Sequence, residues 1–247
     1  MHRFYVKQNQ ITDQIVRIIG PDVNHIKNVL RMKQGEELVI CDGQGKDCYC
    51  IISRVTESEI IADIQTTQDT GTELRTRITL FQGLPKQDKM ELIIQKAVEL
   101  GVHEIIPVMT KRTIVKLDDK KKEEKKLERW QAIAEGAAKQ SGRGIIPTIK
   151  PVQTYAGALD YAKSLDRSVI PYENAKGMDY TRELINSLTS CNTIGVFIGP
   201  EGGFEDTEID QAERVGIQPI TLGRRILRTE TAGLAVLAMM VLVLDRD

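Results

Sequence analysis

The sequence predicts an α/β fold preceded by a small β-barrel. Residues 1–70 contain short β-branched and aromatic runs separated by turn residues, with one helical segment among them. From Arg77 onwards, such runs alternate with helical patterns, and this alternation indicates a parallel sheet with helices on both faces. The polar residues 71–76 carry no periodic hydrophobicity and read as a linker. The predicted domains are therefore a barrel at 1–70, a linker at 71–76 and an α/β domain at 77–247.

Each element of the barrel is placed by its own run of residues. Asp42 to Gly45 lie between two apolar runs and mark a hairpin-like turn, and a helical segment is expected near residues 24–30. The expected strands are 4–6, 14–19, 37–41, 47–55 and 60–65.

The α/β domain opens with a strand at 78–83 and a helix that begins at Asp88 and is closed by Gly101. Thr207 and Asp210 have the spacing of a capping pair at the start of a later helix. Further strands are expected at 102–109, 168–172, 193–198 and 217–222, and helices at 127–140, 155–164, 180–188 and 207–216.

The last helix, 229–244, differs because its sequence from Ala232 onwards is apolar on every side. Its apolar run is much shorter than the roughly 20 residues that a membrane span requires. We therefore expect it to be buried between its own sheet and a second surface, most simply that of a second copy in a homodimer.

Composition limits the possible functions. The chain has 247 residues and 41% hydrophobic content, which is enough for a real core. Its 34 basic and 35 acidic residues nearly cancel, so any contact with RNA requires a local basic patch. Cys41, Cys48, Cys50 and Cys191 lack the spacing of metal ligands, and we expect no metal and reduced thiols. Residues 1–10 lack the apolar core of a secretory signal, so a cytoplasmic location is expected.

Two motifs follow predicted strands: FIGPEGGF at 197–204 and LGRRILRTET at 222–231. Ligands of open α/β sheets collect at the carboxyl ends of strands, so we expect both motifs to line one pocket. In the first motif, glycine lets the backbone adopt unusual angles or lie against a flat ligand. In the second motif, a cluster of three arginines indicates that an anionic group lies close by: Arg224, Arg225 and Arg228. For the first motif alone, a turn that binds nothing is an equal alternative.

GPEGGF followed by LGRRILRTETA resembles the signature of the ribosomal RNA small subunit methyltransferase E family, uridine N3 methyltransferases of 16S rRNA within the knotted SPOUT superfamily. The resemblance extends along nearly the whole chain. It implies S-adenosylmethionine as cofactor, a trefoil knot, a PUA-like RNA-binding barrel at the N-terminus, and 16S rRNA within the small ribosomal subunit as substrate.

Methylation at N3 of a uridine would require a proton acceptor, or a cation that stabilises the developing anion, and charged residues of the two motifs are the candidates. Arg228 is expected to stabilise the developing uridine anion, and Glu230 or Glu201 to accept its proton. The alternatives are that Glu201 only braces its own turn and that Glu230 only stabilises a helix N-terminus. The residues expected to bind the cofactor are Tyr172, Ile198, Gly199, Pro200, Glu201, Gly202, Gly203, Leu222, Gly223, Ile226, Leu227 and Thr229.

Five basic residues are expected to face RNA: Arg3, His25, Arg31, Arg112 and Arg143. Arg143 stands between two glycines, where an exposed guanidinium can bind a phosphate through two hydrogen bonds. The alternative for His25 and Arg31 is that they belong to the solvated face of a helix.

Two other functions were compared with a methyltransferase. A non-catalytic RNA-binding ribosome assembly factor has no need of intact glycine turns, which argues against it. A phosphate-binding α/β enzyme is disfavoured because neither GxxxxGKS nor GxxxxGKT occurs in the sequence.

Overall fold

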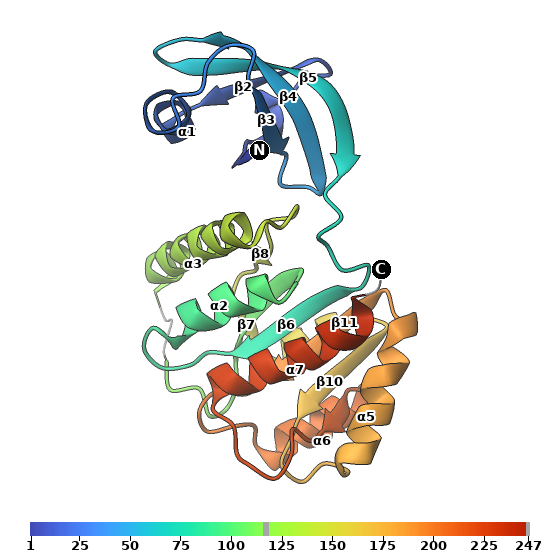
Figure 1. Ribbon diagram of the computed structural model, residues 1–247. Helices are drawn as coiled ribbons and strands as arrows, with labels where there is room; N and C mark the ends of the chain where they lie inside the picture. The colour runs from blue at the N-terminus through green and yellow to red at the C-terminus, as the bar shows by residue number, and fades with distance from the viewer. Residues whose placement is uncertain (116–118, 246–247) are drawn as a thin grey trace. The chain divides into compact units, whose positions relative to one another are not determined.

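The structure is a computed structural model that describes residues 1–115 and 119–245. The chain forms two compact units (Figure 1). Unit 1 comprises Met1–Glu73 and Ala138–Ile146, and unit 2 comprises Leu74–Ala137 and Pro147–Asp247. The segment Ala138–Ile146, which the predicted boundaries place in the α/β domain, thus belongs to unit 1.

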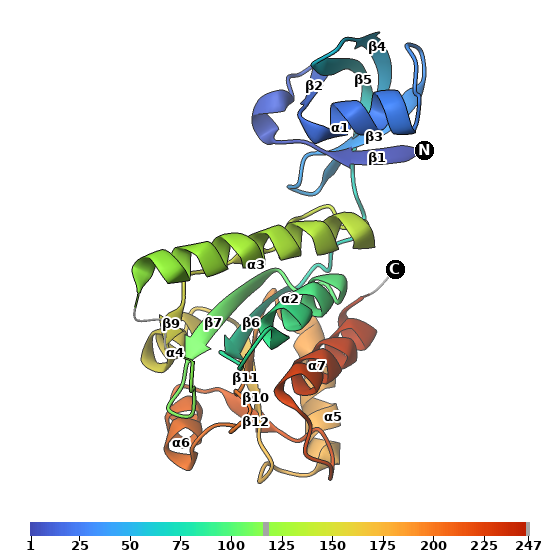
Figure 2. The same ribbon diagram turned by 90° about the vertical axis from the view of Figure 1, so that its left-hand side faces the viewer.

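Unit 1 is built on a curled five-stranded sheet with the order β1-β3-β4-β5-β2 (Figure 2). The β1–β3 pair is parallel and the other pairs are antiparallel. Irregularities in the β4–β5 register at Tyr49/Cys50 and Ile52/Arg54 bend the long strands, as bulges do. The strands are β1 His2–Tyr5, β2 Ile15–Ile19, β3 Glu37–Cys41, β4 Lys46–Val55 and β5 Glu59–Asp69.

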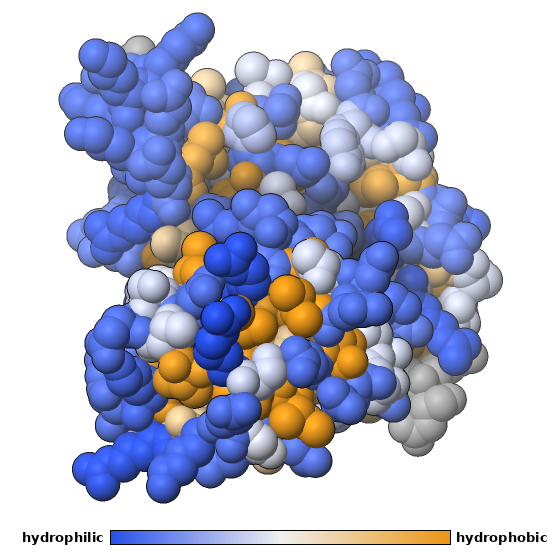
Figure 3. All heavy atoms as spheres, turned by 90° about the horizontal axis from the view of Figure 1, so that it is seen from above, coloured by the Kyte–Doolittle hydropathy of each residue, from blue (hydrophilic) through white to orange (hydrophobic). Residues whose placement is uncertain are grey.

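The expected strands are all present, but β5 continues to Asp69 instead of ending at residue 65. The expected helical segment is a turn of α-helix, α1 Pro21–Asn24, that continues as a π-helix, η2 His25–Val29. A 3-10 turn, η1, covers Gln8–Gln10. The barrel core is apolar and includes the fully buried side chains Val16, Ile18, Ile26, Leu38, Ile40 and Ile60. Most of the face seen in Figure 3 is hydrophilic, with apolar side chains in smaller patches.

Unit 2 contains a seven-stranded sheet whose main path is β12-β10-β11-β6-β7-β8, with β9 also paired to β7. Every pair is parallel. The prediction of a parallel α/β sheet is confirmed. The strands are β6 Arg77–Gly83, β7 Glu104–Met109, β8 Thr148–Ile149, β9 Gln153–Thr154, β10 Arg167–Pro171, β11 Thr193–Ile198 and β12 Gln218–Ile220.

Helices cover both faces of this sheet. The stacked rings of Phe81 and Phe197 pack with residues of α4 and α6 on one face, while α2, α5 and α7 lie on the other (Figure 2). The helices are α2 Lys89–Glu99, α3 Lys120–Ser141, α4 Tyr155–Ala162, α5 Met178–Ser187, α6 Asp206–Arg214 and α7 Thr229–Leu244, with a 3-10 turn, η3 Leu188–Ser190.

The predicted cap of α6 is wrong. The capping box consists of Glu205 and Glu208, each accepting from the other's backbone N–H, and not of Thr207 and Asp210. The N-cap, Glu205, thus lies two residues before the expected Thr207, and the helix begins at Asp206. Glu208 is also buried and accepts a hydrogen bond from the Lys111 amide at 2.9 Å, which ties the loop after β7 to the start of α6.

Helix α7 is buried on one face only within the described chain. The buried residues are Thr229, Gly233, Val236, Leu237, Met240 and Leu244. On the opposite face Leu242 is 83% exposed, and Ala238 is also exposed. The single chain therefore leaves part of an apolar helix uncovered, where burial on both faces was expected. In the described residues, no helix is both long and apolar enough to cross a membrane.

Candidate functional site

The two C-terminal motifs meet at the carboxyl edge of the parallel sheet. The Thr229 hydroxyl, in the first turn of α7, donates to the Gly199 carbonyl at 2.6 Å. The same hydroxyl accepts from Gln82 Nε2, at the end of β6, at 2.9 Å. Thr229 is only 5% exposed; its bond with Gln82 is buried and its bond to Gly199 is partly buried. They join the ends of β6 and β11 to the start of α7.

The glycine turn that follows β11 is tightly packed. A Cβ atom at Gly199 would lie 3.0 Å from the Cα of Gly203, so a larger residue there would require the turn backbone to shift. A hydrogen bond from the Gly203 amide to the Pro200 carbonyl, at 2.9 Å, closes the turn. Beside Gly203 itself the space is open, since a Cβ atom there would meet no atom within 4 Å.

Glu201, in this turn, is held by the segment that leads into α2. Its carboxylate accepts from the Lys86 amide at 3.0 Å and forms an ion pair with Lys89 Nζ at 3.1 Å. Burial raises the pKa of Glu201, but hydrogen bonds from its own amide and from Lys89 outweigh burial, so its pKa is lowered. A carboxylate with a lowered pKa is a weak base, and these contacts favour the bracing role for Glu201.

Glu230, in the first turn of α7, is the less constrained carboxylate. Its Oε2 atom is buried and has no hydrogen-bond partner among the described residues. Its ion pair with Lys89, at 3.5 Å, is longer than that of Glu201. Of the two candidate proton acceptors, Glu230 is therefore the more available.

The loop between β12 and α7 is open and positively charged. The side chains of Arg224, Arg225 and Arg228 are exposed and form no hydrogen bond or ion pair with a described residue. The N–H groups of residues 224–227 likewise donate to no described residue. Ile226 is 90% exposed. Gly223 has φ +102°, with open space where a side chain would be. The loop therefore offers both guanidinium groups and backbone N–H groups as hydrogen-bond donors that no described residue uses.

Two other predicted residues lie around the glycine turn. Arg112, in the loop after β7, donates to the Gly202 carbonyl at 2.7 Å. Tyr172 follows β10; its hydroxyl donates to Asp206 Oδ1 at 2.8 Å and its amide to the Ile220 carbonyl at 2.9 Å. The ends of β7, β10 and β12 are thus also close to the first motif or to the helix that follows it.

In unit 1, the expectation of an exposed guanidinium at Arg143 is wrong. Arg143 is 4% exposed and forms an ion pair with Glu73 Oε2 at 2.5 Å. Glu73 also accepts from the amides of Gly144, at 2.9 Å, and Ile145, at 3.2 Å. The residue that neutralises Arg143 lies in the segment predicted to be a linker.

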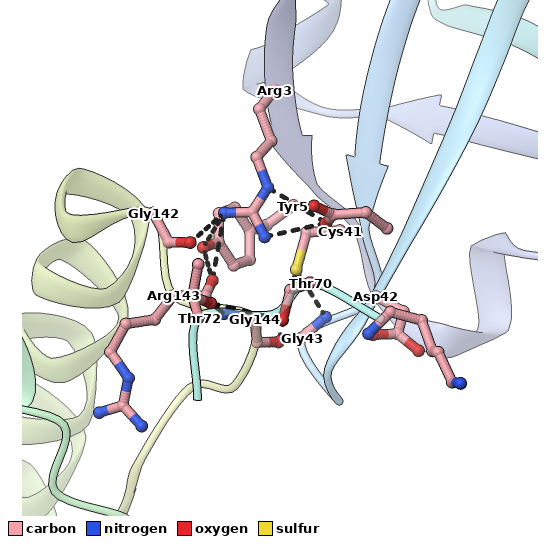
Figure 4. A network of polar contacts seen from close by, with 12 residues as sticks. Arg3, Tyr5, Cys41, Asp42, Gly43, Thr70, Thr72, Gly142, Arg143 and Gly144 are labelled. Carbon is pink, nitrogen blue, oxygen red and sulfur yellow. Dashed lines mark hydrogen bonds and ion pairs between the residues drawn. The ribbon is translucent and has the colours of Figure 1, made fainter. Parts of the chain in front are cut away.

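Arg3 is also engaged within unit 1. Its guanidinium forms an ion pair with Asp47 at 2.9 Å and donates to the Gly142 carbonyl at 2.8 Å (Figure 4). Neighbouring Tyr5 donates to the Arg143 carbonyl, and burial raises the pKa of Tyr5 to about 12, so its hydroxyl stays protonated. Arg3 and Arg143 hold segment 138–146 on the barrel, and both guanidinium groups are engaged within unit 1.

Comparisons with known proteins agree with this architecture. Residues 72–241 match a family described as an RNA methyltransferase domain, and residues 18–65 match an RNA methyltransferase PUA domain. The ribosomal RNA small subunit methyltransferase E of Bacillus subtilis (strain 168) is 34% identical over 244 residues, covering 96% of this chain and 95% of that protein. The protein of that name from Mesomycoplasma hyopneumoniae (strain 232) is 38% identical over 239 residues, covering 96% and 97%.

The chain belongs to the ribosomal RNA small subunit methyltransferase E family.

Solved structures support the same family. The crystal structure of a ribosomal RNA small subunit methyltransferase E from Neisseria gonorrhoeae bound to S-adenosyl methionine has a TM-score of 0.83, with 36% identity over 98% of both chains. A methyltransferase from Legionella pneumophila in complex with the same cofactor has a TM-score of 0.80, with 32% identity over 97% of this chain and 96% of that one. The predicted fold class, a parallel α/β sheet preceded by a PUA-like barrel, is confirmed.

Three of the basic residues expected to face RNA are exposed in this family member: Arg112, described above, and His25 and Arg31 in unit 1. His25 and Arg31 are both exposed, and the His25 ring meets Phe4 edge-on with ring centroids 5.9 Å apart. Arg31 has φ +55°, an unusual angle for a residue with a side chain, at the end of the π-helix. Their role in RNA binding stays a prediction.

Sequence reasoning missed three residues of this family member's site: Gln82, Lys86 and Lys89. All three lie at or just beyond the carboxyl end of β6, the same kind of position that identified both motifs. Their position after a predicted strand could have identified them, but the prediction for this segment used only the apolar face of the following helix. Among the described residues, no group of three or more His, Cys, Asp or Glu side chains could hold a metal ion.

Proposed function

We propose that this protein is an S-adenosylmethionine-dependent methyltransferase that methylates N3 of a uridine in 16S rRNA. The observation that carries the proposal is the hydrogen bond from Thr229 to Gly199, which joins the two motifs at the carboxyl ends of the parallel strands. Relatives along the whole chain carry the name of that enzyme, and the Neisseria structure is bound to S-adenosyl methionine.

The residues at this edge fit such a cofactor. Open space beside Gly203 and Gly223 leaves room for a flat group against the backbone. The free N–H groups of residues 224–227 suit the adenine and carboxylate of the cofactor. The residues proposed to hold it are Tyr172, Ile198, Gly199, Pro200, Glu201, Gly202, Gly203, Leu222, Gly223, Ile226, Leu227 and Thr229. When bound, S-adenosylmethionine supplies the methyl group on a sulfonium, so the protein contributes mainly orientation.

The remaining chemistry concerns the uridine. Its N3–H proton must leave before or during formation of the bond to the methyl carbon. The unpaired guanidinium of Arg228 stabilises the negative charge that develops on the uracil ring. The carboxylate of Glu230, two residues further, accepts the proton. Glu201 braces the glycine turn through Lys86 and Lys89.

RNA contact requires a local basic patch, since the net charge is only −1. Arg224 and Arg225 supply it beside the proposed cofactor site, and Arg112, bonded to the Gly202 carbonyl of the glycine turn, adds a third exposed cation. In the PUA-like barrel, His25 and Arg31 are exposed and remain candidates. Arg3 and Arg143 are not included among the proposed RNA contacts, because both form ion pairs within unit 1.

The proposal also includes the oligomeric state, the path of the last helix, the location in the cell and the RNA partner. The uncovered apolar face of α7, with Leu242 83% exposed, supports a homodimer in which a second copy covers that helix. Family resemblance supports a trefoil knot through which the last helix passes, a cytoplasmic location, and 16S rRNA of the small ribosomal subunit as the partner.

Mass spectrometry of 16S rRNA tests the function. Cells lacking this protein should lack one methyl group on a uridine, and the wild-type gene should restore it. Arg228→Ala should not restore it. Arg214→Ala, which removes an exposed arginine at the end of α6, serves as the matched control and should. An unchanged methylation pattern in the deletion strain would favour the assembly factor, and full rescue by Arg228→Ala would remove that residue from the mechanism.

A further inference from the structure

Lys89 occupies a position that links three parts of unit 2. It is the first residue of α2, and its ammonium lies 3.1 Å from Glu201 Oε1 and 3.5 Å from Glu230 Oε2. Glu201 belongs to the glycine turn and Glu230 to the first turn of α7. We propose that Lys89 is a positioning residue that holds the two walls of the cofactor site together. The inference rests on the proposed function.

The charges explain why a cation is needed there. Glu201 and Glu230 are both partly buried, with side chains 28% and 17% exposed. Within the described chain, Lys89 is the one basic side chain that forms an ion pair with either of them. Without it, two carboxylates would share a partly desolvated site and repel each other.

The two carboxylates differ in what else holds them. Glu201 keeps the hydrogen bond from the Lys86 amide at 3.0 Å. Glu230 Oε2 has no hydrogen bond to a described residue that could hold it in the absence of Lys89. Loss of Lys89 should therefore displace the first turn of α7 more than the glycine turn. Arg228 stands two residues before Glu230, so the same displacement should also move the loop that carries Arg224, Arg225 and Arg228.

The ion pairs of Lys89 are separate from the hydrogen bonds of Thr229. The Thr229 hydroxyl joins buried strand ends, whereas Lys89 joins charged groups at the partly exposed rim. Lys89 acts through Glu201 and Glu230 and is not placed at the reacting atoms. Its effect should appear first in cofactor affinity, because both segments belong to the proposed cofactor site.

Isothermal titration of S-adenosylmethionine into the full chain measures that affinity without turnover. Lys89→Met should raise Kd about tenfold or more, while Lys89→Arg should stay within about threefold of wild type. Lys96→Met is the matched control, since Lys96 lies on the same helix but pairs with Glu99 at 2.8 Å, and it should leave Kd unchanged.

A charge-cancelling variant separates positioning from a general packing role. In the Lys89→Met background, Glu230→Gln removes the repulsion, so the double variant should bind the cofactor more tightly than Lys89→Met alone and approach wild type. Loss of lysine packing alone would give no such recovery. If Lys89→Met does not fold, the double variant is compared directly with wild type, and a loss of tenfold or more overturns the inference.

The outcomes also separate this inference from the proposed function. Wild type that binds the cofactor, together with Lys89→Met that binds it equally well, overturns the role of Lys89 and leaves the function standing. Wild type that fails to bind the cofactor overturns the proposed function itself.

Discussion

Replacing Thr229 by valine tests the buried joint between the two motifs. Valine has nearly the same shape as threonine, so little cavity forms, but both hydrogen bonds of the hydroxyl are lost. The Gly199 carbonyl loses the donor that the structure gives it. Gln82 Nε2 keeps a second bond, to the Gly83 carbonyl at 2.9 Å. One partly buried acceptor is thus left unsatisfied, and one buried donor keeps a single partner.

An unsatisfied buried polar group costs about 1–3 kcal/mol. Because Gln82 keeps a partner, we expect the free energy of unfolding of unit 2 to fall by about 2–3 kcal/mol in Thr229→Val. For a chain of this size that corresponds to a decrease of about 4–12 °C in Tm. Thr229→Ser keeps the hydroxyl and loses one methyl group, so its cost should be about 1 kcal/mol.

Urea unfolding followed by tryptophan fluorescence is the assay. Trp130 is the only tryptophan in the sequence, is buried in α3 and belongs to unit 2, so its signal reports that unit. The expected order of stability is wild type, then Thr229→Ser, then Thr229→Val. If Thr229→Val unfolds within about 0.5 kcal/mol of wild type, the joint does not hold the motifs together and the reasoning fails.

Three further predictions concern charge and thiols. Burial raises the pKa of Glu73, but its contacts with Arg143 and two amides outweigh burial and lower it, so its stabilising contribution is complete above about pH 4.5 and is lost as pH falls towards the folded pKa. The difference in urea midpoint between wild type and Glu73→Gln, measured by far-UV circular dichroism, should therefore shrink from pH 6 to pH 3; a constant difference contradicts this. Burial raises the pKa of the Cys41 thiol to about 11, so at pH 8 a thiol reagent should label mainly the half-exposed Cys191 in the folded protein, and rapid labelling of further thiols would contradict the buried assignment. Arg224→Ala and Arg225→Ala should each weaken RNA binding and reduce the slope of log K against log salt by about 0.7–0.9, whereas an unchanged slope means that the loop contacts no phosphate.

Local patterns predicted the elements well, because strands and helices are set by the periodicity of apolar residues. β11 was placed at its observed bounds, and α7 starts at Thr229, the expected start within the second motif. The meeting of the two motifs followed from a general rule about the carboxyl ends of parallel strands. The cap of α6 was misplaced because Glu205 and Glu208 have the same spacing as Thr207 and Asp210.

The errors involve partners that are distant in sequence. Arg143 was expected to be exposed because its neighbours are glycines, yet its counter-charge, Glu73, stands 70 residues away. Lys89 was missed for a similar reason, since the carboxylates it contacts belong to two turns far along the chain. Composition and spacing do not reveal such pairs, because each is created by the tertiary fold.

The inclusion of Ala138–Ile146 in unit 1 has a consequence for biosynthesis. Although the barrel begins at the first residue, it lacks the segment that receives Arg3 and Tyr5 until translation has passed Ile146. A nascent chain should therefore carry an incomplete barrel while much of the second unit is being synthesised. An excised fragment that stops at Glu73 would share that defect permanently.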